Sequence, residues 1–271
     1  MAPGELRIAI LGCTGRMGRA VLQAMDESPG LVLGGASASP GSRSLGQDAG
    51  AAAGGRPLGV TITADPGVAL RGADLAIDFT LPEATLSNLR AALAAHCPLI
   101  IGTTGLDSAV REQITAAAAQ IPILLAPNMS MGVNLLLKLA ELAGAALDES
   151  YDAEIFEAHH RNKKDAPSGT ALALGRAVAE GRGVEFDAAA QYARHGITGA
   201  RIPGTIGFSV FRGGDVIGDH TVTFAGTGER IELTHRASDR LAFARGAVRA
   251  ARWIRGRAPG LYSMRDVLGI A

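Results

Sequence analysis

The sequence predicts an α/β protein in which a doubly wound parallel sheet is followed by a second, α+β domain. Over the first 130 residues, short apolar runs alternate with segments whose apolar residues recur at helical spacing. Short buried strands separated by helices are typical of a parallel sheet that is covered on both faces. Beyond residue 130 the alternation stops, and a long helical segment leads into a polar stretch and several strand-like segments. We therefore expect a domain boundary near residue 130.

The first domain, residues 1–130, is expected to consist of strands joined by helices. Its strands are expected at 7–11, 31–36, 75–79, 98–102 and 121–126. Its helices are expected at 16–26, 82–96 and 107–120. Ligands of open parallel sheets bind beyond the carboxyl ends of the strands, so the loops that follow these strands are candidate binding segments.

The second domain, residues 131–239, is expected to mix helices and strands. Its helices are expected at 132–147 and 170–180, and residues 151–158 have strand character. Three further strands are expected at 205–211, 216–224 and 230–235. Glycine turns separate these three strands, which favours an antiparallel meander. A final helix is expected at 240–254.

Charge and cysteine content exclude several kinds of partner. Lys plus Arg and Asp plus Glu both number 26, and a net charge of zero gives no general attraction to nucleic acid or to an anionic membrane. Cys13 and Cys97 lie far apart, and the adjacent His159 and His160 would project in different directions, so no metal site is expected. The N-terminus lacks the pattern of a secretory signal, and the apolar segment 133–147 is too short and too charged to span a bilayer. These features indicate a cytoplasmic protein.

A glycine-rich turn, GCTGRMG at 12–18, separates the first expected strand from the first expected helix. Such glycines permit a tight turn and let a pyrophosphate approach backbone N–H groups at the positive end of a helix. The alternative is a turn that serves packing alone, but the strand–turn–helix context favours nucleotide binding. The candidate cofactor-binding residues of this turn are Gly12, Cys13, Thr14, Gly15, Arg16 and Met17.

Two further loops of the first domain are candidates for the same cofactor. They follow the strands expected at 98–102 and 121–126, where the nicotinamide half of a dinucleotide would lie. Each loop alone is also compatible with an ordinary turn that carries a helix-capping Thr or Ser, but the agreement of three loops favours a dinucleotide. The candidate residues are Gly102, Thr103, Thr104, Ala126, Pro127, Asn128 and Met129.

The stretch EAHHRNKKDAPSGT, at 157–170, is the most informative part of the sequence. It combines two histidines and three cationic residues with a helix start that contains Ser168, Gly169 and Thr170. Free N–H groups at a helix start, with hydroxyl groups, bind a carboxylate, and nearby cations supply the remaining charge for a small dianion. Histidine exchanges protons near neutral pH, as a general acid or base must. The alternative is a solvated loop before a capped helix, but the combination favours a substrate site.

These motifs resemble those of the 4-hydroxy-tetrahydrodipicolinate reductase (dihydrodipicolinate reductase) family over nearly the whole chain. The matching segments are GCTGRMG (12–18), IDFT (77–80), IGTTG (101–105), NMSMGVN (128–134), EAHHRNKKDAPSGTAL (157–172), RIPGTIGF (201–208), GDH (218–220) and MRDVL (264–268). The resemblance implies a Rossmann domain to which residues 240–271 return. It also implies a second domain that binds a small dicarboxylate substrate and forms a homotetramer through its sheet.

The resemblance further implies a reaction and residue roles. The reaction is the NAD(P)H-dependent reduction of 4-hydroxy-tetrahydrodipicolinate to tetrahydrodipicolinate, with loss of water, in diaminopimelate and lysine biosynthesis. His159 corresponds to the proton donor/acceptor, Lys163 to the proton donor, and His160, Gly169 and Thr170 to substrate-binding residues. Ser168 is a candidate from the same helix start. Two alternatives, an amino-acid dehydrogenase acting on another dicarboxylate and a cofactor-binding regulator without turnover, are disfavoured by the PSGT segment.

One departure from the family pattern concerns cofactor choice. The Glu-Arg pair that often follows the second strand is missing, and no acid occurs between Glu27 and Asp48. An acid about 20 residues beyond the glycine turn normally binds the ribose 2′-hydroxyl of NADH. Ser37, Ser39 and Arg43 are instead candidates for contact with a 2′-phosphate, although a simple solvated loop is the alternative. We expect both NADPH and NADH to be used, with a preference for NADPH.

Overall fold

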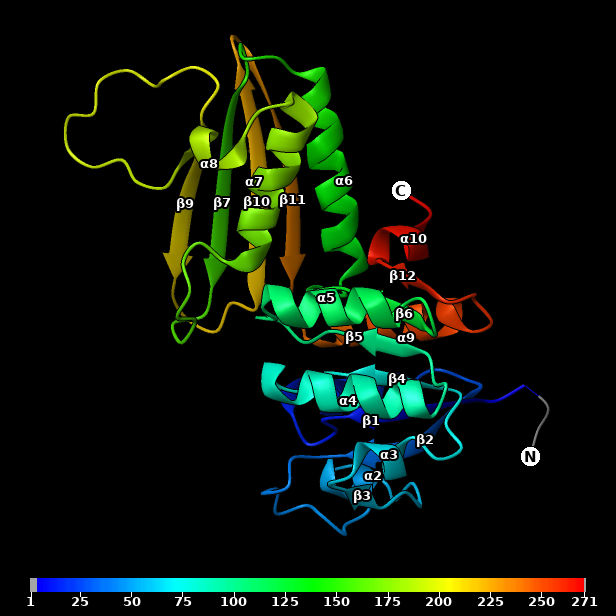
Figure 1. Cartoon of the computed structure of the whole chain (residues 1–271). Helices are drawn as coiled ribbons and strands as arrows, with labels where there is room; N and C mark the ends of the chain where they lie inside the picture. The colour runs from blue at the N-terminus through cyan, green and yellow to red at the C-terminus, as the bar shows by residue number, and fades with distance from the viewer. Residues whose placement is uncertain (1–3, 271) are drawn as a thin grey trace. The chain divides into compact units, whose positions relative to one another are not determined.

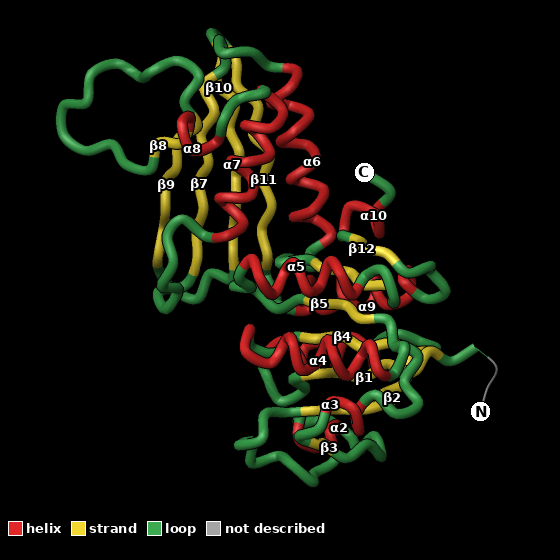
Figure 2. Tube along the Cα trace, in the orientation of Figure 1, coloured by secondary structure: helices red, strands yellow, loops and turns green. Residues whose placement is uncertain are grey.

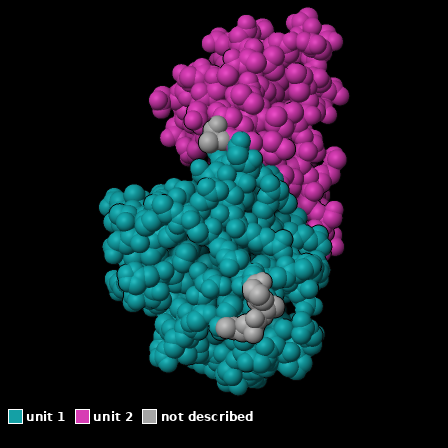
Figure 3. All heavy atoms as spheres, turned by 90° about the vertical axis from the view of Figure 1, so that its right-hand side faces the viewer, with its two compact units in different colours: residues 1–131, 240–269, 271 teal, residues 132–239, 270 magenta. Residues whose placement is uncertain are grey.

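The structure is a computed structural model that describes residues 4–270, and the chain divides into two compact units (Figure 3). Unit 1 comprises the chain through Met131 together with Arg240–Gly269, and unit 2 comprises Gly132–Asp239 and Ile270. Residues 1–3 and 271, at the ends of the expected ranges 1–130 and 240–271, lie outside the described residues.

Unit 1 is built on a seven-stranded sheet. Its strands are β1 (Leu6–Leu11), β2 (Leu31–Ser37), β3 (Ile62–Thr63), β4 (Leu75–Asp78), β5 (Leu99–Ile101), β6 (Pro122–Leu125) and β12 (Gly260–Tyr262). Their order in the sheet is β12-β6-β5-β4-β1-β2-β3, and every neighbouring pair is parallel (Figure 1). This is the strand order of a Rossmann sheet, extended at one edge by β12 from the C-terminal segment.

Helices cover both faces of this sheet. They are α1 (Arg16–Asp26), α2 (Ala49–Ala52), α3 (Pro66–Ala69), α4 (Pro82–Ala94), α5 (Ser108–Ala117), α9 (Leu241–Ile254) and α10 (Met264–Leu268). Ile8 and Ile10 of β1 belong to one hydrophobic cluster with residues of α1 and α9, whereas Ala9 and Leu11 belong to another with residues of α4 and α5. Successive side chains of a strand point to opposite faces, so a strand covered on both faces is apolar at nearly every position.

Unit 2 is built on a mixed five-stranded sheet. Its strands are β7 (Asp152–His159), β8 (Ala190–Gln191), β9 (Ile206–Arg212), β10 (Gly218–Gly226) and β11 (Glu229–Ala237), in the order β11-β10-β7-β9-β8. Three helices belong to the same part of the chain, namely α6 (Met131–Ala146), α7 (Gly169–Arg182) and α8 (Phe186–Ala189). Side chains of all three helices pack against one face of the sheet (Figure 1). The expected fold class, a Rossmann sheet with a second α+β part, is confirmed.

The expected antiparallel meander is wrong in one respect. β10 and β11 form the expected antiparallel hairpin, but β9 is not a neighbour of β10. Instead β7 lies between them and pairs parallel with β9 and antiparallel with β10. The connection from β7 to β9 contains α7, α8, β8 and a long loop, residues 192–205 (Figure 2), and a crossover of this length allows a parallel pairing. The parallel pairing sets Arg212, the last residue of β9, beside His159, the last residue of β7.

Candidate active site

The loops predicted to bind a cofactor follow neighbouring strands of the unit 1 sheet. The strands β1, β2, β4, β5 and β6 are parallel, so the loops after them lie along one edge. β1 lies between β2 and β4, and ligands of doubly wound sheets bind at this change of direction in the strand order. The fold therefore brings the predicted segments 12–17, 102–104 and 126–129 to the same edge.

The loop after β1 has a backbone that requires glycine. Gly12 has a φ of +82°, in the left-handed region, and a Cβ on Gly18 would lie 2.2 Å from the carbonyl oxygen of Gly12. The N–H groups of Gly12 and Cys13 both donate to the carbonyl of Ser37 at 2.9 Å, which ties the end of β1 to the end of β2. A tight glycine turn into the N-terminus of α1, at this point of the sheet, fits the pyrophosphate of a dinucleotide.

The other predicted cofactor residues differ in exposure. Those with exposed or half-buried side chains or backbones are Thr14, Gly15, Arg16, Met17, Ser39, Arg43, Thr104, Pro127 and Asn128. Those that are buried are Cys13, Ser37, Gly102, Thr103, Ala126 and Met129. Burial raises the pKa of the Cys13 thiol to about 11, so this side chain is a protonated packing group. The buried members shape the loops, whereas the exposed members are accessible to a ligand.

A buried carboxylate with no predicted role connects two of these loops. Asp78, at the end of β4, accepts hydrogen bonds from the backbone N–H and the hydroxyl of Thr80 at 2.8 and 2.6 Å. It also accepts one from the amide of Asn88 at 3.0 Å. Thr103, in the loop after β5, donates its hydroxyl to the carbonyl of Thr80 at 3.2 Å. Burial raises the pKa of Asp78, although these hydrogen bonds oppose the shift. In the sequence Asp78 ends an apolar strand and belongs to the IDFT segment, 77–80, that carries the family resemblance.

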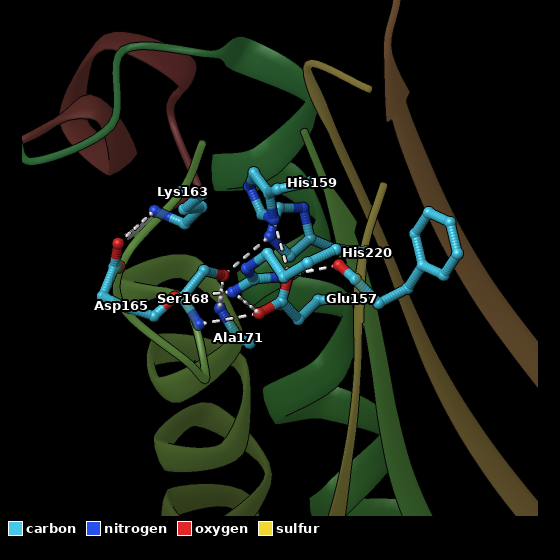
Figure 4. Close-up of polar contacts among 9 residues, drawn as sticks. Glu157, His159, Lys163, Asp165, Ser168, Ala171 and His220 are labelled. Atoms are coloured by element: carbon cyan, nitrogen blue, oxygen red, sulfur yellow. Dashed lines mark hydrogen bonds and ion pairs between the residues drawn. The ribbon is translucent and has the colours of Figure 1, made fainter. Parts of the chain in front are cut away.

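The predicted substrate residues lie in unit 2, at the end of β7 and the start of α7. His159 and Glu157 lie two residues apart on β7, so their side chains share one face of the sheet. Both side chains are buried, and Nδ1 of His159 lies 2.5 Å from Oε2 of Glu157. Figure 4 shows these two side chains together with Ser168 and His220 as one group of polar contacts.

Glu157 is ionised and fully hydrogen-bonded. Arg212 donates through both terminal nitrogens, Nη1 to Oε2 and Nη2 to Oε1, each at 2.7 Å, and the backbone N–H of Ser168 donates to Oε1 at 2.9 Å. Burial alone would raise the pKa of Glu157, but the hydrogen bonds from His159, Arg212 and Ser168 outweigh it and lower the pKa to about 2. A carboxylate accepts hydrogen bonds only, so the proton between Glu157 and His159 belongs to Nδ1 of the histidine.

The hydroxyl group of Ser168 makes two contacts within the protein. It is the N-cap of α7, and its hydroxyl oxygen accepts from the N–H of Ala171 at 3.2 Å. The same oxygen lies 3.1 Å from Nε2 of His220, a residue of β10. Burial, with the nearby charge of His159, lowers the pKa of His220 to about 4. A neutral ring accepts the Ser168 hydroxyl proton at Nε2, so Ser168 links the helix start to the sheet.

The remaining predicted substrate residues surround this cluster. Lys163 donates its Nζ to Oδ1 of Asp165 at 2.9 Å (Figure 4), and its backbone N–H donates to the carbonyl of His160 at 3.1 Å. Gly169 is exposed, and a Cβ built on it would meet no atom within 4 Å. Thr170 is half-buried, beside it in the first turn of α7.

Glu157, Arg212 and His220 had no predicted role. Glu157 and His220 lie within segments that carry the family resemblance, and the period-two spacing of Glu157 and His159 on a strand is a signal for their contact. Arg212 has no comparable signal, because it reaches Glu157 only through the parallel pairing of β9 with β7. Within residues 4–270 no group of three or more His, Cys, Asp or Glu side chains is arranged to hold a metal ion. In the same part of the chain, no helix is both long and apolar enough to cross a bilayer.

A Rossmann sheet with a glycine turn at its change of direction, joined to a unit that carries a buried carboxylate–histidine pair, is the architecture of a two-domain oxidoreductase. The chain belongs to the dihydrodipicolinate reductase family. The family's N-terminal model matches residues 6–129 and its C-terminal model matches residues 132–268.

Relatives and solved structures agree with this assignment. A 4-hydroxy-tetrahydrodipicolinate reductase from Thiobacillus denitrificans is 57% identical over 266 residues, which cover 98% of this chain and 99% of the relative. One from Bordetella pertussis is 56% identical over 264 residues, covering 97% of both chains. The solved structure of a dipicolinate-bound dihydrodipicolinate reductase from Paenisporosarcina sp. TG-14 matches with a TM-score of 0.77 and 25% identity, over 97% of this chain and 98% of that one. The resemblance drawn from the motifs, and the reductase class that it implies, are confirmed.

Proposed function

We propose that the chain catalyses the NAD(P)H-dependent reduction of 4-hydroxy-tetrahydrodipicolinate to tetrahydrodipicolinate in diaminopimelate and lysine biosynthesis. The substrate ring gains a hydride from NAD(P)H and a proton, and it loses its hydroxyl group together with one ring hydrogen as water, while NAD(P)H becomes NAD(P)⁺. The observation that carries the proposal is the buried Glu157–His159 pair beside the helix start of Ser168, in a chain of this family.

The start of α7 is assigned to a carboxylate of the substrate. Gly169 and Thr170 form the first turn of this helix, where backbone N–H groups and the positive end of the helix dipole favour an anion. The space beside Gly169 is open, as a ligand requires. The Paenisporosarcina enzyme was solved with dipicolinate, a ring with two carboxylates, which supports this class of ligand. Ser168, which also caps the helix, and His160 are assigned to the same substrate.

His159 and Lys163 are assigned to proton transfer. The contact with Glu157 keeps Nδ1 of His159 protonated, which leaves Nε2 as the nitrogen that exchanges a proton. Lys163 is the proton donor implied by the family, and Asp165 holds its ammonium group in the same loop. Positioning and charge placement supply the rest of the rate enhancement.

The loops at the edge of the unit 1 sheet are assigned to the cofactor, which supplies the hydride when bound. We propose that both NADPH and NADH are used, with a preference for NADPH. Asp48, the first acid after Glu27, accepts hydrogen bonds from the backbone N–H groups of Ala51, Leu58 and Gly59, so it is committed to its own loop. The exposed Ser39 and Arg43 are then the groups assigned to a 2′-phosphate.

The two parts of the chain are assigned different roles. Residues 1–130, with 240–271, are proposed to bind the dinucleotide, and residues 131–239 to bind substrate and to form a homotetramer. The face of the unit 2 sheet opposite its helices carries the exposed Phe156 and Phe211, which supports burial of this face between copies of the chain. A cytoplasmic location is supported by the free, buried Cys13 and Cys97. Light scattering of the purified protein tests the tetramer.

One assay tests the proposed reaction. The purified chain is mixed with NADPH or NADH and with freshly generated 4-hydroxy-tetrahydrodipicolinate, and the loss of nicotinamide absorbance is followed. We expect substrate-dependent oxidation of the cofactor and formation of tetrahydrodipicolinate. Oxidation with another small dicarboxylate, and none with this substrate, would overturn the proposal.

A further inference from the structure

The carboxylate of Glu157, which contacts His159, has more hydrogen-bond partners than a side chain that serves only packing needs. Glu157 is buried in the unit 2 sheet, yet its two carboxylate oxygens accept hydrogen bonds from three different parts of that unit. These donors are His159 of the same strand, Arg212 at the end of β9 and the backbone of Ser168 at the start of α7. Burial of a carboxylate costs free energy unless hydrogen bonds and opposite charges compensate for the lost water. Here the compensating groups are His159 itself, Arg212 and the backbone of Ser168.

We infer that Glu157, held by Arg212, is the positioning residue of the reaction, and that it fixes His159 in the tautomer with Nδ1 protonated and Nε2 free to exchange a proton. The inference rests on the proposed function, since it assigns His159 the proton-transfer step. Glu157 contacts neither substrate nor cofactor in this role and acts through the imidazole ring alone.

Arg212 is what makes Glu157 a fixed acceptor. Its two terminal nitrogens bind one carboxylate oxygen each, and they also donate to the backbone carbonyls of Phe211 and Asp165, at 2.7 and 2.6 Å. This bidentate geometry fixes both the charge and the orientation of the carboxylate. With Arg212 present, Glu157 stays ionised while it accepts the Nδ1 proton of His159.

A glycine lies next to the opposite side of the imidazole. A Cβ on Gly218, the first residue of β10, would lie 3.0 Å from Nε2 of His159. Glycine at this position therefore leaves the Nε2 side of the ring unobstructed by a side chain of its own. When the ring is in its cationic form, Nε2 gives one proton to the substrate, the neutral ring retains its Nδ1 proton beside Glu157, and Nε2 later regains a proton from water.

The alternative is that Glu157 only neutralises the half-buried Arg212. The two roles predict different outcomes for three variants of the full chain. Glu157→Gln removes the charge and presents an amide N–H to Nδ1, which favours the wrong tautomer. Arg212→Gln leaves Glu157 without its charged partner. The double variant E157Q/R212Q leaves no unpaired charge, so it is expected to fold even where the single variants are destabilised.

For Glu157→Gln we expect kcat to fall by roughly 10- to 10⁴-fold, as for other groups that orient a functional histidine, with little change in the KM for NAD(P)H. The solvent deuterium isotope effect on kcat is expected to rise, because proton transfer becomes slower relative to the other steps. Glu157→Asp, which retains the charge, is expected to recover part of the loss. The matched control is Glu180→Gln, the same substitution at an exposed carboxylate near the C-terminal end of α7, and it is expected to leave kcat near the wild-type value.

The double variant decides between the two roles. If Glu157 positions His159, E157Q/R212Q stays as slow as Glu157→Gln. If Glu157 only neutralises Arg212, the double variant recovers wild-type kcat, and the inference is overturned. A Glu157→Gln variant with wild-type kcat and isotope effect overturns it as well. A wild-type chain that does not reduce 4-hydroxy-tetrahydrodipicolinate would overturn the proposed function, and the inference with it, so the two failures are distinguishable.

Discussion

The side-chain amide of Asn88 donates a hydrogen bond of 3.0 Å to the carboxylate of Asp78, and both side chains are buried. Asn88 lies in α4 and Asp78 ends β4, so the bond fastens a helix to the edge of the sheet where the candidate cofactor loops lie. A buried carboxylate that loses a donor keeps its desolvation cost. The contact therefore stabilises the loops as well as the helix.

Asn88→Ala is expected to lower the free energy of unfolding by about 1–3 kcal/mol, because Asp78 loses a donor that nothing replaces. Urea unfolding measures the change. Thr85, on the same helix, is the matched control, since its buried hydroxyl has no hydrogen-bond partner within residues 4–270. Thr85→Val is expected to leave stability unchanged or to raise it. Equal losses in both variants would mean that the Asp78–Asn88 bond has no specific effect.

His159→Gln is expected to lower kcat by roughly 10²–10⁴-fold, the usual contribution of a general acid or base. The dissociation constant for NAD(P)H should barely change, because His159 lies in unit 2 and the cofactor loops lie in unit 1. Steady-state kinetics and a fluorescence titration measure the two quantities. His195→Gln, at an exposed histidine in the loop 192–205, is the control and should behave as the wild type. A His159→Gln variant with near-normal kcat would contradict the assignment.

Thr170→Val is expected to raise the KM for the substrate. Loss of one hydroxyl donor to a charged group costs about 1.5–3 kcal/mol, which corresponds to roughly a 10- to 100-fold change. NAD(P)H binding should remain intact. The same substitution at the exposed Thr115, in α5, is the control. An unchanged substrate KM would show that the start of α7 is structural only.

Arg43→Ala is expected to abolish the preference for NADPH and to leave NADH kinetics nearly unchanged. The guanidinium group of Arg43 is exposed, as contact with a 2′-phosphate requires, whereas NADH offers it only a hydroxyl group. The ratio of kcat/KM for the two cofactors is the measurement. Arg56→Ala, which removes another exposed arginine of unit 1, should leave this ratio as it is. A clear NADH preference in the unmodified protein would contradict the reading of the Ser39–Arg43 segment.

Acid is expected to destabilise unit 2 in two stages. Burial, together with the charge of His159, lowers the pKa of His220 from 6.5 to about 4. As the pH falls through this range, the unfolded chain takes up a proton that the folded chain does not, so the free energy of unfolding decreases. Glu157 follows at lower pH. Its pKa is lowered from 4.5 to about 2, so the stabilisation present above 4.5 is lost as the pH falls toward 2.

His220→Gln isolates the first stage. Glutamine still offers an acceptor to the Ser168 hydroxyl, but it does not titrate. Urea unfolding across both ranges is expected to show a smaller loss of stability between pH 6.5 and about 4, with the second stage unchanged. Some slope remains in the first stage because burial also lowers the pKa of His235. An unchanged slope in the variant would show that His220 is protonated in the folded protein.

The sequence by itself determined the fold class and most of the elements of both units. Strands that are buried on both faces are nearly continuous apolar runs, which a sequence shows without a structure. β1 is apolar except at Arg7, and β4 is apolar up to its last residue, Asp78. The glycine turn at 12–18 could also be predicted from the sequence, because the positive φ of Gly12 and the close packing at Gly18 both require glycine. These are local requirements, so they appear as local patterns.

The tertiary structure alone decided how unit 2 assembles its site. Arg212 and Glu157 are 55 residues apart in the sequence, and they are in contact because β7 lies between β9 and β10. The turn residues between the strands do not predict this strand order. The same pairing turned the expected meander into a mixed sheet. Short elements such as β3 and β12 were not predicted, because runs of two or three residues carry no periodicity.

The side chains of Asp78 and Ser168 show the same limit. From the sequence Asp78 was one residue of a motif and Ser168 a candidate substrate-binding residue. The folded chain adds that Asp78 is a buried acceptor for several donors and that Ser168 contacts Ala171, Glu157 and His220. The identity of a polar residue states which hydrogen bonds it is able to make. Which of them it makes depends on partners that are distant in the chain, and only packing brings those partners within reach.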